Sequence, residues 1–416
     1  MGRFIERDSA LFRPTPFASV AAHHMSSPSE TSNRARRVSF QFQEGGLGLV
    51  ILLLGLLLTL FGGSVKVPLF ELNAEGQRQR IFTTNAAGER EPVAVEKNKF
   101  LNAQNLAQLA KDTSFIAIMA VGATFVIISG GIDLSVGAIY ALASVLGALV
   151  FQRYGPSGPD TLQTVAADGS MILSSGWYAV PVGILMCLAV GTAAGLTNGG
   201  MIVALKVHPF IITLGTMAIF RGIAFVITKG QSVGSFPQDF RDLVRWEVGN
   251  GLSLMPLAVM LAIMVVGGIY LSRLAAGRRI YAIGGNELAS RFSGIRVERV
   301  KLSVYVYSGL TAGIAALLSL GYYGAATSGD GQGYELNVIA AAVVGGASLS
   351  GGKGSALGAV LGALLIQMIS SGIVILGIDQ NYSQIIIGAV VIIAVVLDQI
   401  NSWLAKRRLA ARAGTT

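Results

Sequence analysis

Charged residues are scarce in this chain of 416 residues. They make up 13% of the sequence, against 52% for hydrophobic residues. Soluble domains carry roughly 25% charged residues, so this composition excludes one or several ordinary soluble domains, and the same deficit excludes a disordered chain. The apolar residues are gathered in long runs. We therefore predict an all-α, polytopic integral membrane protein.

Cysteine and histidine are almost absent. The single cysteine, Cys187, lies inside an apolar run, so the chain can form no internal disulfide and no cysteine-based zinc site. Of the three histidines, His23 and His24 lie in a polar segment and His208 stands alone at an expected helix start. No H-E-x-x-H motif occurs, and no catalytic grouping of Cys and His is present. We expect no catalytic residues, no metal and no cofactor on this chain.

A phosphate-binding P-loop is also missing. The motif requires G-x-x-x-x-G-K-[ST], but the only Gly-Lys pair, Gly352-Lys353, is followed by Gly354, and Ala347 stands at the position of the first glycine. The chain is therefore not expected to bind ATP in this way. The net charge of +9 is interpreted as a topology signal of a membrane protein rather than as a sign of nucleic-acid binding.

Three regions follow from the distribution of apolar residues. Residues 1–46 are predicted to be a polar, mostly flexible cytoplasmic tail, 47–400 a transmembrane domain, and 401–416 a basic cytoplasmic tail. About ten spans are expected, and the eighth is short and rich in glycine, which is typical of a broken or re-entrant helix. The expected spans are 47–63, 113–130, 134–152, 178–198, 209–228, 252–272, 302–323, 335–347, 355–377 and 382–400.

The charges of the connecting loops predict the orientation. The loop 273–301 holds seven Lys or Arg residues, whereas the short loops on the other side hold few. By the positive-inside rule, both termini are predicted to be cytoplasmic. The long polar loop 64–112 is then external. It is compatible with a small hairpin or a flexible insertion, and Leu101 to Lys111 are compatible with a short amphipathic helix leading into the second span.

A glycine-rich turn occurs twice. Residues 130–137 (GGIDLSVG) and 345–352 (GGASLSGG) share the pattern G-G-x-[D/S]-L-S-x-G, about half the chain apart. This echo is typical of the internal repeats of transporters, although two Gly/Ser-rich turns also match by chance. Asp133 and Ser135 are candidates to cap the next helix or to line a translocation path.

Arg221 lies near the middle of an expected span. Such an arginine is costly in lipid and marks the bundle interior or a polar cavity. Its expected partner is a carboxylate or the carbonyl groups at a helix C-terminus. The sequence leaves a structural role and a role in the path both open.

The basic loop 273–301 contains a predicted two-turn helix. Asn286 is suited to cap its start and Gly294 to end it. A segment with apolar and basic faces is equally compatible with lying on the membrane surface and with docking in a groove of a cytoplasmic partner.

Small residues recur at every fourth position in two rows. Such rows form one helix face. They indicate either packing within the chain or the seam of a dimer. The rows are Gly191, Gly195 and Gly199, and Gly354, Gly358 and Gly362.

Five motifs in this order resemble the membrane-spanning permease subunits of bacterial ABC importers of the ribose/xylose/arabinose type, over about residues 100–405. They are GGIDLSVG at 130–137, TLGTM…RG at 213–222, GGN…A…SGI at 284–295, GYEL…IAA at 333–341 and GG…SGG at 345–352.

The resemblance implies a pore formed with a second permease copy or a paralogue, a separate cytoplasmic ATPase that carries ATP and Mg, and a periplasmic sugar-binding protein. It also implies that the basic loop holds a coupling helix that receives the ATPase. Asp133, Ser135, Arg221 and Glu335 become candidates for the path or its gate. The coupling residues would be Gly285, Asn286, Ala289, Ser290, Gly294 and Ile295.

Two features depart from the family pattern, namely the long polar N-terminal segment and the long 64–112 loop. The sequence also leaves other functions open. They are a related permease for branched-chain amino acids or nucleosides, an ion-coupled secondary carrier, and a membrane scaffold or receptor. A secondary carrier would require more intramembrane carboxylates than the chain shows.

Overall fold

The computed structural model describes residues 31–72, 78–84, 90–155, 162–165, 171–174, 178–234, 236–248 and 252–413. The chain divides into two units, Met1–Phe42 and Gln43–Thr416. Most of the predicted N-terminal tail lies outside the described residues. Its last part is helical, because the first helix begins at Thr31 rather than near residue 47.

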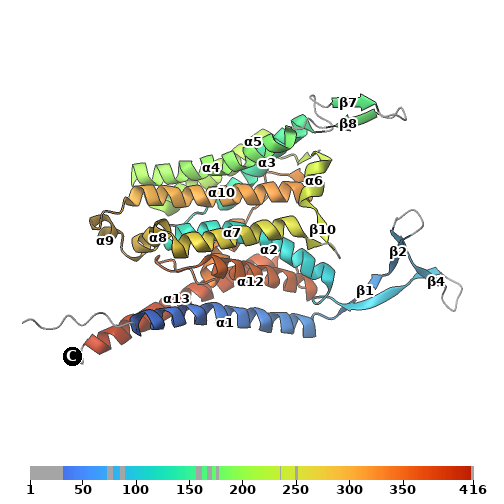
Figure 1. Ribbon diagram of the computed structural model, residues 1–416. Helices are drawn as coiled ribbons and strands as arrows, with labels where there is room; N and C mark the ends of the chain where they lie inside the picture. Colours follow the sequence, from blue (N-terminus) through green and yellow to red (C-terminus); the bar gives the residue numbers. More distant parts are fainter. Residues whose placement is uncertain are drawn as a thin grey trace, which may run out of the picture. The chain divides into compact units, whose positions relative to one another are not determined.

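The described part of the chain is mainly helical (Figure 1). The helices are α1 (Thr31–Phe61), α2 (Ala103–Ile128), α3 (Val136–Tyr154), α4 (Ala179–Leu205), α5 (Pro209–Thr228), α6 (Gln238–Val244), α7 (Leu254–Arg273), α8 (Ala275–Gly285), α9 (Glu287–Phe292), α10 (Val297–Tyr323), α11 (Tyr334–Val344), α12 (Ala356–Ile375) and α13 (Tyr382–Ala413). All strand pairs are short and antiparallel. They are β1 (Ser64–Pro68) with β6 (Ala94–Asn98), β2 (Phe70–Leu72) with β3 (Arg78–Arg80), β4 (Phe82–Thr84) with β5 (Arg90–Pro92), β7 (Leu162–Val165) with β8 (Met171–Ser174), β9 (Val233–Gly234) with β12 (Ala325–Ala326), and β10 (Glu247–Val248) with β11 (Leu252–Ser253).

Each of the ten predicted apolar segments contains a helix, but the count of ten spans is not confirmed. Among the described residues, eight helices are long and apolar enough to cross a membrane. The other two apolar segments are α11, with 11 residues, and Tyr382–Val396 of α13. At 1.5 Å per residue α11 is about 16 Å long, roughly half of a hydrocarbon core. The predicted basic tail 401–416 continues α13 as far as Ala413.

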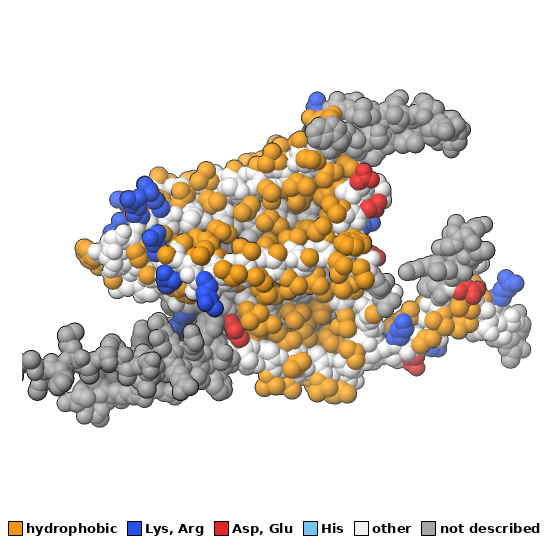
Figure 2. Space-filling model, viewed as in Figure 1, with side chains coloured by type: hydrophobic (Ala, Val, Ile, Leu, Met, Phe, Trp, Pro, Cys, Tyr) orange, Lys and Arg blue, Asp and Glu red, His pale blue; other side chains and the backbone are white. Residues whose placement is uncertain are grey.

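The α2 helix forms the centre of the helix bundle. It packs against α7, α10, α11 and α12, and every residue from Thr113 to Ile128 is buried. By contrast, α1, α5 and α7 expose large apolar side chains such as Leu52, Val226 and Val266. Figure 2 shows hydrophobic side chains over most of the visible face. A helix bundle with an apolar outer surface is suited to lipid and not to water.

The two rows of glycines pack within the chain. Gly191 and Gly195 of α4 face the backbone of α10, where Gly309 and Gly313 face back toward α4. The second row behaves similarly in part, because Gly358 and Gly362 of α12 lie against the end of α11, at Gly345 and Ala341. Gly354 precedes that helix, with a φ of +147°. The described contacts therefore favour packing within the chain over a dimer seam for these rows.

The predicted external loop 64–112 contains a β-hairpin followed by the start of α2. Strands β1 and β6 pair from Ser64 with Asn98 to Pro68 with Ala94. The expected short helix 101–111 is instead the first part of α2, which runs on without a break to Ile128. Lys111 is buried there because its ammonium pairs with Asp112 at 3.1 Å and lies 4.0 Å from the Tyr322 ring centroid.

Candidate functional site

The helix predicted in the basic loop is present as α9, and its two ends have the expected signals. The Asn286 side chain accepts a hydrogen bond from the backbone N–H of Ala289 at 2.9 Å. Beyond the last turn, Gly294 adopts a φ of +79°. The N–H groups of Gly294 and Ile295 donate to the carbonyl groups of Arg291 and Ser290. These two bonds form a Schellman motif, which glycine favours at the left-handed position.

The α9 helix presents an apolar pair to the outside. Leu288 is 63% exposed and Phe292 is 83% exposed, and their spacing of four residues places both on one helix face. Both residues were absent from the predicted coupling set, although an apolar pair at this spacing could have been found in the sequence. Of that set, Gly285, Asn286, Ala289 and Gly294 are exposed, Ile295 is half-buried and Ser290 is buried.

Three ion pairs join α9 to the start of α10 or brace it internally. Arg291 pairs with Glu298 at 2.6 Å, and Lys301 pairs with Glu287 at 2.7 Å. Arg291 also lies 3.8 Å from Glu287. Exposed pairs of this kind contribute little to stability, because water and salt screen the attraction. Their main effect is to orient α9 relative to α10, and their contribution to the stability of the fold is small.

The end of α8 makes a close backbone junction with two other elements. Gly284 lies directly against the carbonyl group of Ile128, the last residue of α2. The N–H of Gly352 donates to that same carbonyl at 2.8 Å, and Gly351 contacts the Gly284 backbone. The junction brings together the neighbourhoods of the two glycine-rich turns predicted as a repeat, because Ile128 lies just before the turn 130–137 and Gly352 is the last residue of the turn 345–352.

A tyrosine reinforces the same junction from α8. The Tyr281 hydroxyl donates to the carbonyl group of Gly354 at 2.7 Å. Burial raises the pKa of Tyr281 to about 12, so the hydroxyl keeps its proton at physiological pH. The segment that carries α9 is therefore attached to the end of α2 and to the turn before α12.

Asp133 lies at the centre of a buried polar cluster. Its carboxylate accepts hydrogen bonds from the Ser135 hydroxyl at 2.7 Å, the Ser135 N–H at 3.0 Å and the Ser308 hydroxyl at 2.7 Å. The Asn198 amide in turn donates to the Ser135 hydroxyl at 2.7 Å. Ser135 is the N-cap residue of α3 but makes no side-chain cap bond. The cluster thus connects the start of α3 to α4 and α10.

Arg221 is bound by backbone carbonyl groups. Its guanidinium donates to Ser328 at 3.0 Å and to Asp330 at 2.6 Å. Both acceptors belong to the segment before α11, rather than to a carboxylate or a helix C-terminus as expected. Glu335, in the first turn of α11, accepts the N–H of Gly333 at 3.3 Å, and its other carboxylate oxygen is buried without a partner among the described residues.

We expect Arg221→Gln to loosen the segment before α11. A glutamine is too short to reach both carbonyl groups, and a lost hydrogen bond to a charged group costs roughly 1.5–3 kcal/mol. Thermal unfolding of the purified protein should begin at a lower temperature than in the parent chain. Arg221→Lys, which keeps the charge but not the planar fork, should lie between the two. An unchanged transition in Arg221→Gln would show that these bonds do not hold the segment.

Comparison with known proteins shows which family this sequence matches. The family described as "Branched-chain amino acid transport system / permease component" matches residues 105–395. The ribose import permease of Escherichia coli K12 is 35% identical over 301 residues, 72% of this chain and 87% of that protein. The ribose import permease of Bacillus subtilis 168 is 36% identical over 310 residues, 74% of this chain and 88% of that protein.

A further relative transports another substrate. The D-allose permease of E. coli K12 is 36% identical over 304 residues, 73% of this chain and 86% of that protein. No solved structure matches this chain. The family match begins after the hairpin of β1 to β6 and inside α2, so α1 and the hairpin lie outside it.

Proposed function

This chain belongs to the branched-chain amino acid transport system/permease component family, and on that premise we propose that it forms the membrane path of an ABC importer for a monosaccharide. It is a multi-pass protein of the bacterial inner membrane. The sugar follows from the relatives, since ribose and D-allose are monosaccharides. The family description favours one second candidate, a branched-chain amino acid as the cargo.

The observation that carries the proposal is the exposed apolar pair on α9. Leu288 and Phe292 project from a short helix that is capped at both ends and fixed by ion pairs. An apolar helix face with i, i+4 anchors fits a groove on a partner protein. The chain has no P-loop of its own, so the partner in this proposal is a cytoplasmic ATPase that carries ATP and Mg.

The predicted coupling residues have distinct tasks in this proposal. Asn286 and Gly294 set the two ends of α9, and Ser290 and Ile295 provide the backbone atoms of its C-terminal motif. Ala289 and Gly285 lie exposed beside the apolar pair. Movement of α9 then reaches the membrane segments through Gly284, which contacts the end of α2 and the turn before α12.

The candidate path residues fall into two groups. Arg221 and Glu335 hold or face the segment before the short helix α11, and a half-length helix with its N-terminus inside the membrane is typical of substrate sites in transporters. They are proposed to line or gate the path. Asp133 and Ser135 are buried and hydrogen-bonded to neighbouring helices, which supports a role in holding the wall of the path.

The remaining assignments concern the sidedness of the chain in the membrane, its domains and its other partners. The α8–α9 end is proposed to be cytoplasmic, together with both termini, because the loop 273–301 is the most basic. The domain limits proposed from the sequence, 1–46, 47–400 and 401–416, are retained as proposals, and α1 begins at Thr31 before its apolar span Glu44–Phe61. A periplasmic sugar-binding protein is proposed to dock at the opposite end, and a second permease copy or paralogue to complete the pore.

Purification of the tagged chain from its native membrane in mild detergent tests the proposal. A stoichiometric partner with a P-loop is expected by mass spectrometry. Leu288→Asp and Phe292→Asp should each lose that partner and lower ATP-dependent sugar uptake at least tenfold, since anchor residues of an interface are each worth 2 kcal/mol or more, roughly thirtyfold in affinity.

The control is an equivalent change at the other end of α7. Val248, which is 49% exposed in β10, becomes aspartate in Val248→Asp, and this variant should keep the ATPase partner. A chain that purifies alone and moves solute in liposomes without ATP would contradict the proposal and favour a secondary carrier. Uptake of leucine in place of any pentose or hexose would favour the second candidate.

A further inference from the structure

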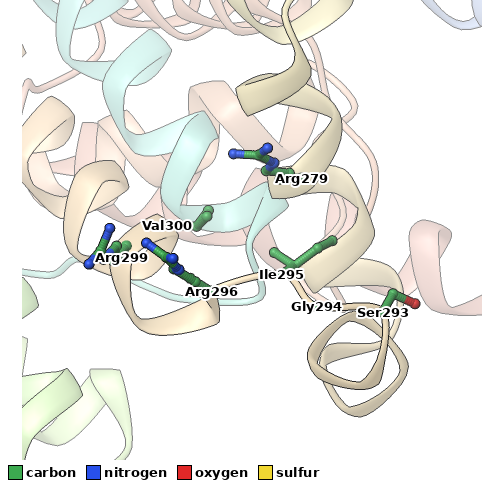
Figure 3. A pocket seen from close by; sticks show the side chains of 7 residues that line it. All are labelled: Arg279, Ser293, Gly294, Ile295, Arg296, Arg299 and Val300. Atoms are coloured by element: carbon green, nitrogen blue, oxygen red, sulfur yellow. The ribbon is translucent and has the colours of Figure 1, made fainter.

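Three arginines line a hollow at the joint between α9 and α10. The cavity has a volume of about 520 Å³ and is lined by Arg279 of α8, Arg296 and Arg299 at the start of α10, Ile295 and Val300, with Ser293 and Gly294 at its edge. Figure 3 shows the three arginine side chains on the same side of the joint as Val300, whereas the Ser293 side chain points away from them. The hollow is separate from the exposed apolar pair on α9.

These arginines have no carboxylate to balance them. Within the described residues, no ion pair or side-chain hydrogen bond is made by Arg279, Arg296 or Arg299, and the nearby carboxylates of Glu287 and Glu298 are engaged by Lys301 and Arg291. Arg296 is the N-cap residue of α10, and Arg299 lies in the first turn of that helix. Like charges gathered in this way repel one another, and an anion bound between them would relieve that repulsion.

The position of the hollow indicates the kind of anion. Arg279 lies on α8, which follows α7 directly, and α7 exposes Val265, Val266 and Ile269 to the outside. Figure 2 shows Lys and Arg side chains at the α8–α9 end of the visible face, next to the hydrophobic side chains that cover the helices. A basic site at the edge of a lipid-facing surface corresponds to the headgroup level of a membrane.

We propose that Arg279, Arg296 and Arg299 bind the phosphate of an anionic phospholipid such as phosphatidylglycerol. Guanidinium groups bind phosphate through paired hydrogen bonds. Ile295 and Val300 supply an apolar wall for the glycerol and the first acyl carbons. The hollow lies at the N-terminal end of α10, where the helix dipole favours an anion. The lipid lies between α8 and α10, beside the base of α9.

Binding is measured on the purified full-length chain in mild detergent by native mass spectrometry. The probe is dioleoyl phosphatidylglycerol, compared with dioleoyl phosphatidylcholine, which carries the same phosphate without a net negative charge. The parent chain should retain phosphatidylglycerol in preference to phosphatidylcholine. Each Arg→Gln change at 279, 296 or 299 should weaken that binding about fivefold, and the triple variant about a hundredfold, since a basic residue near a lipid surface contributes about 1 kcal/mol.

Two controls separate this site from general basicity. Arg278→Gln removes the same charge from the neighbouring position of α8, which does not line the hollow, and it should leave binding near that of the parent. The parent chain should also lose the anionic lipid as salt is raised, because the attraction is screened. This salt measurement needs no variant and holds even if the triple variant fails to fold.

Several results would overturn the proposal. One is equal retention of phosphatidylglycerol by the parent and a folded triple variant, and another is indifference to salt. Displacement of the lipid by inorganic phosphate at the same concentration would assign the hollow to a free anion. Loss of the ATPase partner by the triple variant, with lipid binding unchanged, would assign the arginines to the ATPase interface.

Discussion

Gly195→Leu should nearly abolish accumulation of the folded protein in the membrane. Gly195 faces the carbonyl group of Tyr305 on α10 so closely that even a Cβ would overlap it. The neighbouring contacts of Gly191 with Gly309 are equally close. In lipid, helices associate through close packing of such small residues rather than through hydrophobic burial. A leucine would therefore separate α4 from α10, and the overpacking costs about 3 kcal/mol or more.

The same helix provides a matched control for this prediction. Gly200 also belongs to α4, but no atom lies within 4 Å of a Cβ placed there. Gly200→Leu should therefore accumulate as the parent does. The measurement is the amount of tagged protein in membranes that elutes as a single species in size-exclusion chromatography. Equal amounts of the Gly195→Leu and Gly200→Leu variants would contradict the close packing of α4 on α10.

The apolar segments were predictable because lipid imposes a simple demand. Each helix that crosses the bilayer needs a long run of apolar residues. This demand located ten apolar segments that contain helices, and eight of the described helices are long enough to cross a membrane. It could not locate helix ends that extend into polar sequence. Ala103 to Asp112 of α2 and Val297 to Lys301 of α10 are helical but carry charged or amide side chains. Hydropathy therefore predicted these two starts too late.

Capping residues in the sequence predicted the two ends of α9, but the sequence did not predict α8 or its contact with Gly352. Capping by Asn286 and termination at Gly294 depend on residues within one helical turn, so the sequence alone indicates them. The α8 helix, with its two adjacent arginines, is too short and too polar to stand out as a span. Its contact with Gly352 joins residues 68 positions apart, and no local pattern encodes such a contact.

The residues of the candidate path also depend on contacts between distant segments, which local sequence patterns do not encode. An arginine within an apolar span, such as Arg221, predicts a partner inside the bundle, but the partner proved to be carbonyl groups of an irregular segment. Irregular backbone has no periodic signature. The sequence also left a hairpin or a flexible insertion open for 64–112, and pairing of β1 with β6 decides this for the described residues. In each case the answer depends on which distant segments meet.

Gly284→Val should separate partner binding from transport. The Gly284 position lies directly against the Ile128 carbonyl group and the Gly352 N–H. A side chain there must push α8 away from the end of α2, and overpacking of this kind costs about 1–3 kcal/mol. The apolar pair on α9 is untouched. We therefore expect the variant to retain the ATPase partner and its ATP hydrolysis, while ATP-dependent uptake falls at least tenfold, the equivalent of about 1.4 kcal/mol.

The adjacent glycine controls for any change in α8 itself. No atom lies within 4 Å of a Cβ placed at Gly285, so Gly285→Ala should leave the packing of α8 unchanged, with a thermal unfolding transition like that of the parent. If the Gly284→Val variant lost both the partner and the uptake, the substitution would have damaged α9 rather than the junction. Full uptake in that variant would show that the force of ATP hydrolysis reaches the membrane by another route. Side chains also connect this region to its neighbours, among them the hydrogen bond of Tyr281 to Gly354 and the ion pairs of Glu287 with Lys301 and of Glu298 with Arg291. These pairs are exposed and can rearrange at little cost, whereas a backbone contact between glycines cannot yield without moving the helices. For this reason the Gly284 junction, and not the ion pairs, is the element through which α9 should act on α2 and on the turn before α12.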